Sequence, residues 1–135
     1  MEDAGVNWIA VLVAGVASFA FGSIYYMALA KSWMAAVGKT QAEIKNGQNA
    51  MTFAVAFIAQ LVMAYTMARV MAWQGGMDIG TGIAIAITLW VGLIVAAMAV
   101  NHGFQGARRA LTVIDSGHWL GVLVIQGVVI ALFGL

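Results

Sequence analysis

Four long runs of apolar residues, separated by short polar stretches, organise the chain. The six basic and five acidic side chains all fall outside residues 4–30, 46–68, 79–107 and 116–135. Each run has about 20 residues or more, the length a helix needs to cross ~30 Å of hydrocarbon. Apolar residues are nearly continuous and do not alternate with polar ones, which excludes barrel strands. The pattern predicts four membrane-spanning helices, at about 6–30, 50–73, 79–100 and 109–135.

Composition places lipid rather than water around these helices. Of the 135 residues, 64% are hydrophobic and 8% are charged, whereas an ordinary globular chain carries roughly 25% charged residues. A soluble surface this apolar would aggregate. We therefore predict one all-α domain over residues 1–135, a polytopic bundle of four transmembrane helices in contact with the lipid bilayer.

The basic residues predict an orientation. Lys31, Lys39, Lys45, Arg108 and Arg109 flank the two connections on one side, and only Arg69 lies near the other. The positive-inside rule places those connections in the cytoplasm and both termini outside. The acidic start of the chain and its long apolar run predict that the first span is retained rather than cleaved.

The connection over residues 31–49 is predicted to lie at the membrane surface as one or two amphipathic turns. Thr40 and Glu43 have the spacing of a capping box, in which each side chain bonds the other's backbone amide. Gly47 is expected to end this short helix.

Small residues recur at every fourth position in all four spans. Lipid tails are as apolar as leucine, so helices in a membrane associate through close backbone packing, which small residues allow. An ordinary tight bundle and a dedicated dimerisation face both fit these rows. The glycines predicted to pack helices together are Gly22, Gly80, Gly92, Gly117, Gly121 and Gly127.

The fourth span carries polar residues on one face and glycines on the opposite one. Asp115 lies about 9 Å deeper than Arg109 along the helix, and His118 about 13 Å deeper. Such a helix has little surface left for lipid, so it is expected to lie centrally or between the bundle and a partner protomer. The predicted intramembrane polar cluster comprises Asp115, His118, Arg108, Thr112, Gln126, Gln60, Asn101 and His102.

Two interpretations of Asp115 and His118 remain open. An ionisable residue within a membrane is costly unless paired and so suggests function, and these two are helical neighbours that could share a proton. In the structural alternative, Asp115 bonds Arg108, His102 or tyrosine hydroxyls, and His118 is a neutral, hydrogen-bonded core residue. Ser18, Gln60 and Thr88 are expected at the same middle depth.

The residues of the sequence give little support for catalysis or cofactor binding. Cysteine is absent, which removes thiolate catalysis and thiolate metal sites. Ser116 and His118 lie 200° apart on one helix and cannot bond each other, while His102 and His118 with one carboxylate make an incomplete metal set. The net charge of +1 leaves no basic footprint for nucleic acid. We predict no enzyme activity, no cofactor, no metal and no nucleic-acid partner.

Several short blocks of residues stand out by their order and spacing. They are Asn7-Trp8, Gly22 with Tyr25-Tyr26, Lys31-Ser32-Trp33-Met34, Val37-Gly38, Glu43-Ile44-Lys45-Asn46-Gly47, Asn101 with Phe104-Gln105-Gly106, and Ile114-Asp115-Ser116-Gly117-His118. Together these blocks resemble a family of small bacterial membrane proteins catalogued as domain of unknown function family 1761. The resemblance covers essentially the whole chain, although the family pattern often has a proline after the tyrosine pair and Asn where this chain has Asp115. It implies four membrane-spanning helices and no activity.

Together these features predict a multi-pass protein of a bacterial inner membrane. The favoured function is a non-catalytic, self-associating protein or an accessory subunit of a larger membrane complex. The alternative is a small dimeric, proton-coupled solute transporter that uses Asp115 and His118 as its relay, with Gln60 and Thr88 along the path.

Overall fold

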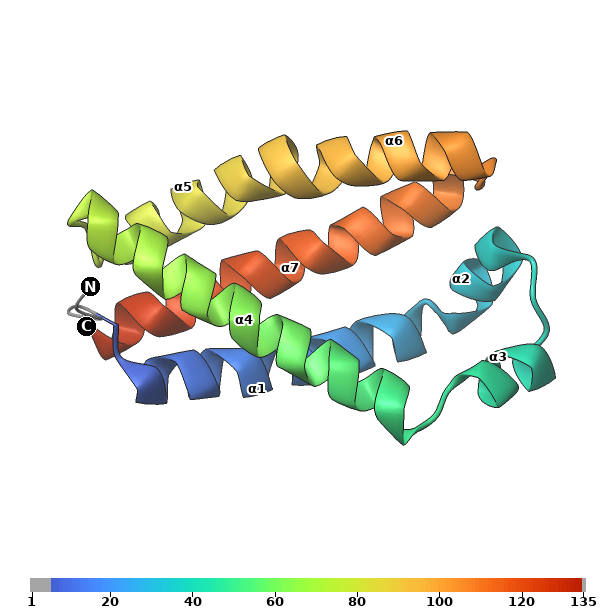
Figure 1. Ribbon diagram of the computed structural model, residues 1–135, viewed down its shortest axis with the longest axis horizontal. Coiled ribbons are helices and arrows are strands. Elements are labelled where there is room, and N and C mark those ends of the chain that lie inside the picture. Colours follow the sequence, from blue (N-terminus) through green and yellow to red (C-terminus); the bar gives the residue numbers. More distant parts are fainter. Residues whose placement is uncertain (1–5, 135) are drawn as a thin grey trace.

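A computed structural model describes residues 6–134, and within them every regular element is a helix. Four helices are long and apolar enough to cross a membrane, which confirms the predicted number. Short helices α2 and α3 lie in the connection between the first two spans (Figure 1). The helices are α1 (Trp8–Ala28), α2 (Ala30–Val37), α3 (Gln41–Gly47), α4 (Ala50–Gln74), α5 (Ile79–Leu89), η1 (Trp90–Val95), α6 (Ala96–Gln105) and α7 (Arg109–Phe133).

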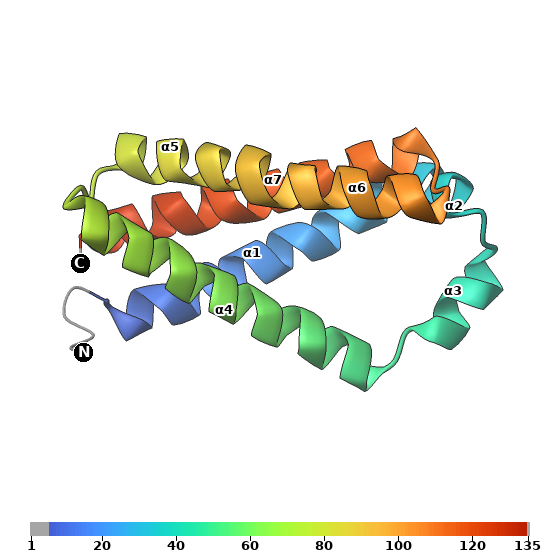
Figure 2. The same ribbon diagram turned by 45° about the horizontal axis from the view of Figure 1, so that its top comes forward.

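Helix α7 occupies the centre of the arrangement. It contacts α1 on one side and α5 on another, and it also contacts α2, α4, η1 and α6. In both views α7 runs between α1 and the α5–α6 helix, with α4 crossing at an angle (Figures 1 and 2). Of the two positions expected for this helix, the structure therefore shows the central one.

Capping residues fix where the helices begin and end. The side chain of Asn7 accepts hydrogen bonds from the amides of Ile9 and Ala10, and that of Asn49 accepts one from Thr52, as N-cap residues do. Gly75 and Gly106 adopt φ of 75° and 69° and end α4 and α6, because glycine has no Cβ to clash in this conformation. The short turn between α4 and α5 is thus a tight reversal.

The capping box of α3 is confirmed. The Thr40 hydroxyl accepts a hydrogen bond from the Glu43 amide at 3.3 Å, and the Thr40 amide donates to the Glu43 carboxylate at 3.2 Å. Helix α3 ends at Gly47, as expected, and the side chains over most of this helix are exposed.

The third span differs from the prediction in length and in geometry. It continues to Gln105, beyond the expected end near residue 100, because Gly106 rather than the first polar residue terminates the helix. Its middle, η1, is a π-helix, in which each turn holds about one residue more than in an α-helix. Nothing in the spacing of apolar residues signals such a segment.

The apolar core fills the half of the bundle nearest the start of α1 and the end of α7. Its fully buried large side chains are Met67 and Met71 from α4 and Ile130 from α7. Small residues on α1, Ala10 and Ala14, let these helices approach closely. The buried polar side chains lie in the middle of the bundle and toward its other end.

Candidate functional site

A hydrogen-bonded polar contact joins three spans at the middle of the bundle. The Ser18 hydroxyl of α1 donates to Gln60 Oε1 of α4 at 2.9 Å. The Gln126 amide nitrogen of α7 donates to Ser18 Oγ at 3.1 Å and to the backbone carbonyl of Gln60 at 2.9 Å. All three side chains are buried. In a membrane such bonds hold helices together, because lipid offers polar groups no partner.

A pair of tyrosines on α1 reaches across to α7 nearer the other end. The Tyr25 hydroxyl donates to the backbone carbonyl of Ile114 at 2.6 Å, and the Tyr26 hydroxyl donates to Asp115 Oδ1 at 2.8 Å. Asp115 is half-buried. This agrees with the structural interpretation, in which a tyrosine hydroxyl satisfies the carboxylate.

His118 lies among aromatic rings, with only 5% of its surface exposed. The ring centroids of Trp119, Tyr26 and Tyr25 lie 4.5, 4.9 and 5.8 Å from that of the imidazole, and Phe21 stacks nearly parallel to it at 6.3 Å. Its Nδ1 is buried and has no hydrogen-bond partner. His118 is thus buried in the core, as in the structural interpretation, and its Nδ1 makes no hydrogen bond.

Three further bonds connect the neighbouring helices with α7 or its N-cap. His102 Nδ1 of α6 lies 2.7 Å from Thr112 Oγ1. The indole nitrogen of Trp90 donates to the backbone carbonyl of Ser116 at 2.7 Å. Arg108, which precedes α7, donates from its guanidinium to the backbone carbonyl of Ala35.

The predicted polar cluster is divided between places in the fold. Asp115 and His118 lie near each other, although Asp115 bonds Tyr26 rather than the imidazole. Asn101 and Arg108 are exposed. Thr88, expected at the middle depth, is exposed and bonds the carbonyl of Ala84 within its own helix. Members of the cluster take part in three contacts between α7 and other helices: Gln126 with Gln60 at the centre, Asp115 with Tyr26 of α1, and Thr112 with His102 nearer the start of α7.

The glycines of α7 pack within the chain. A Cβ at Gly117 would meet the Tyr25 hydroxyl oxygen at 2.8 Å, and one at Gly121 would collide with the Phe21 ring. Gly127 approaches Gly82 of α5 so closely that a Cβ would lie 2.7 Å from its carbonyl oxygen. The glycine face of α7 is thus covered by α1 and α5 and is not open to a partner protomer.

The glycines of the third span behave in the opposite way. Gly80 and Gly92 were expected to pack helices together, but both are exposed, and a Cβ at Gly92 would meet nothing within 4 Å. The sequence spacing identified the small-residue row of the third span, but it could not show whether that side of the helix packs against the other helices or lies on the outer surface.

Trp90 and Phe21 are site residues that sequence reasoning missed. Trp90 lies in the middle of the third span, away from the interfaces where membrane tryptophans usually gather. A buried indole nitrogen needs a hydrogen-bond acceptor. A tryptophan in the middle of a span could therefore have indicated a contact with another helix. Phe21 gave no signal, since one more apolar residue in a span is ordinary.

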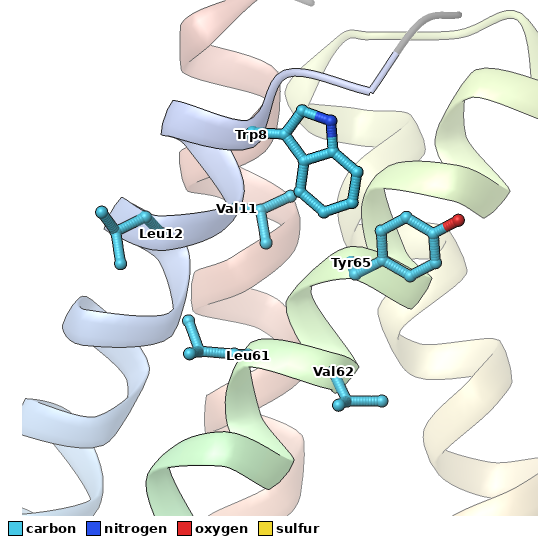
Figure 3. A pocket seen from close by; sticks show the side chains of 6 residues that line it. All are labelled: Trp8, Val11, Leu12, Leu61, Val62 and Tyr65. Carbon is cyan, nitrogen blue, oxygen red and sulfur yellow. The ribbon is translucent and has the colours of Figure 1, made fainter. Parts of the chain in front are cut away.

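An apolar groove of about 400 Å³ opens between α1 and α4 near the start of α1 (Figure 3). It is lined by Trp8, Val11, Leu12, Leu61, Val62 and Tyr65. Trp8 stacks on Tyr65 with ring centroids 5.2 Å apart. The Tyr65 hydroxyl accepts from Arg69 Nη2 at 2.7 Å. The groove offers apolar contact and no group that could perform chemistry.

Taken together, these contacts define the class of protein. Within residues 6–134, no three side chains of the metal-ligating types come together, and the polar groups connect helices. The chain is thus a helical protein with four candidate membrane spans, in which hydrogen bonds between buried polar side chains join neighbouring helices.

The chain belongs to the family described as "Protein of unknown function (DUF1761)", whose model matches residues 9–131. This confirms the resemblance drawn from the sequence blocks. Comparisons with curated proteins and with solved structures find no match.

Proposed function

We propose that this chain is a non-catalytic protein of a bacterial inner membrane that associates with a second copy of itself through the third span. The observation that supports this is the exposure of a complete small-residue row. The row runs along the outer side of α5, η1 and α6 and comprises Gly80, Ala84, Thr88, Gly92 and Ala96.

The small residues of the other spans are largely used inside the protomer. Ala10, Ala14, Ser18 and Gly22 of α1 are all buried, as are Ala64 and Ala68 of α4. Within residues 6–134, only the third span presents a whole row of small residues outward. Close approach of backbones between membrane helices depends on such rows. A second copy with the same row would allow two third spans to pack closely.

The π-helix helps keep the row on one side. In an α-helix, residues four apart drift by about 40° around the axis, so a row of five would wind part of the way around the helix. A π turn holds about one residue more than an α turn, so residues four apart in it shift around the axis in the opposite direction. Because η1 lies between Thr88 and Ala96, it partly cancels this drift.

The interior argues for this function over transport. A proton-coupled transporter needs polar groups along the depth of the membrane. Among the described residues, the buried side chains beyond Gln126, toward the end of α7, are apolar, with Met67, Met71 and Ile130 fully enclosed. The polar groups thus extend from one end of the bundle to its middle.

Single-cysteine crosslinking tests the proposal, and the absence of natural cysteine makes every introduced thiol unique. In membranes, Gly92→Cys should form a disulfide-linked dimer under mild oxidation. Val62→Cys is the matched control, because Val62 is 59% exposed on α4, outside the row. Equal crosslinking at both positions would indicate random collision. A particle that remains a monomer in native mass spectrometry would overturn the proposal.

A further inference from the structure

Two buried side-chain polar atoms among the described residues lack a hydrogen-bond partner, Gln126 Oε1 and Nδ1 of the His118 imidazole, and His118 is the one that can bind a proton. Its Nδ1 lies in the interior without a hydrogen-bond partner. Four rings surround it, three of them from α1, and Trp119 is the nearest at 4.5 Å. Since lipid and aromatic carbon cannot solvate a polar nitrogen, each such group in a membrane protein normally has a protein partner.

One helical turn earlier on α7, the Asp115 carboxylate has a negative charge that no basic side chain in residues 6–134 balances. Its carboxylate accepts a hydrogen bond from the neutral Tyr26 hydroxyl. Within residues 6–134, no lysine or arginine forms an ion pair with it, and Arg108 is directed to the carbonyl of Ala35. Residues three apart on a helix are surface neighbours, about 5–6 Å apart at Cβ. The cation that could balance Asp115 most directly is therefore a protonated His118.

We propose that His118 is a proton-binding site, with the imidazole and Asp115 acting as a charge pair in the protonated state. A hydronium ion from water at the connection end of the bundle gives up its proton. A new N–H bond forms at Nδ1, and a water molecule remains. The imidazolium then lies beside the Asp115 carboxylate and close to the rings of Tyr26 and Trp119, whose centroids are 4.9 and 4.5 Å from its own, and an aromatic ring within about 6 Å can attract a cation.

The groups that bear on this titration come from both helices around the ring. Helix α1 contributes the hydroxyls of Tyr25 and Tyr26, and α7 contributes Asp115. The polar groups nearer the connection end, His102 and Thr112, lie on the side from which the proton would enter. The proposal does not depend on self-association, because none of these residues belongs to the third-span row.

Nuclear magnetic resonance of ¹⁵N-histidine-labelled protein in lipid nanodiscs tests the site directly. The chain has two histidines, so His102→Gln leaves only the signals of His118. Between pH 4.5 and 9 these signals should move from the neutral to the protonated pattern with one midpoint. In that background, Asp115→Asn should weaken proton binding at least tenfold and lower the midpoint by one pH unit or more.

The matched control is Asp78→Asn, which removes the same charge at the opposite end of the bundle and should leave the midpoint unchanged. If Asp115→Asn does not fold, Trp119→Leu replaces it. Loss of the Trp119 ring beside the imidazole should weaken proton binding to His118 roughly threefold or more. The proposal is overturned if His118 stays neutral over the whole pH range. It is also overturned if the titration midpoint is unchanged by every substitution beside the ring.

Discussion

Gly22 marks the closest approach of α1 to the ring of His118. A Cβ at this position would lie 2.7 Å from His118 Nε2, a distance at which one of the two groups must move. The ring has little room to do so, since Phe21 and Tyr26 flank it. Gly22 therefore belongs to the histidine site as much as the aromatic residues do.

We predict that Gly22→Ala destabilises the protein by about 1–3 kcal/mol, the usual cost of overpacking a well-packed interior. Thermal unfolding in a mild detergent measures this. The control is Gly103→Ala on α6, where a Cβ would meet nothing within 4 Å. Because alanine favours helix over glycine by about 1 kcal/mol, the control should be neutral or stabilising. Equal stability losses in both variants would contradict the described packing.

At the same scale, sequence reasoning identified the chemistry of α7 and left several partners open for it. Asp115 and His118 stood out because ionisable groups are rare in spans, and Arg108, His102 and the tyrosine hydroxyls were all possible partners of Asp115. That Tyr26 is the partner depends on how α1 is rotated against α7, which the sequence does not give. A helical wheel gives the angle of each side chain around its own helix, but it does not give the rotation of the neighbouring helix.

At the scale of elements, α3 depends on its capping box. The backbone and side-chain hydrogen bonds from Thr40 lower the pKa of Glu43 below its ordinary value of 4.5. The ionised carboxylate is the form that accepts these bonds, so their stabilisation is complete above that ordinary value. It is lost as the pH falls through the lowered pKa.

We therefore predict that α3 loosens in acid before the spans do. Amide hydrogen exchange over residues 41–47 should accelerate relative to that of α4 when the pH falls from 5 to 3, after correction for intrinsic rates. Thr40→Ala removes the hydroxyl but keeps the backbone amide that contributes most to the lowered pKa of Glu43, so it should reduce this difference, whereas Glu43→Gln removes the titrating carboxylate and should abolish it. Unchanged relative protection across the range would show that the capping box does not hold α3.

The elements themselves were the most predictable part of the fold. Apolar runs predicted four spans because lipid requires that the polar groups of each backbone be satisfied within a helix. The packing faces were harder, since lipid and core are both apolar. Gly80 and Gly127 therefore carry the same signal although one is exposed and the other is buried. The π-helix η1 has no marker in the sequence at all.

At the scale of the whole molecule, charge sets the orientation that we propose. The connection around α3 and the α6–α7 turn lie at one end of the bundle, and the start of α1 and the α4–α5 turn at the other (Figure 1). The basic residues concentrate at the first end, which the positive-inside rule places in the cytoplasm.

A cysteine introduced at Gly47 should accordingly be shielded from a membrane-impermeant maleimide added outside intact cells, and one at Gly76 should react. Opening the cells should make Gly47→Cys reactive as well. Both positions lie at or beyond helix ends, and the cysteine-free background excludes other thiols. The reverse labelling pattern would place the connections outside and overturn the proposed topology.

The central position of α7 has a consequence for biosynthesis. Among the described helices, α1 and α5 share little direct contact, and each packs extensively on α7. Before α7 is in place, α1 can pack on α4, but α5 has only its small contact with α4 to hold it. The third span therefore gains most of its packing only when α7 inserts, and until then a newly made chain leaves the α7-facing sides of α1 and α5 uncovered.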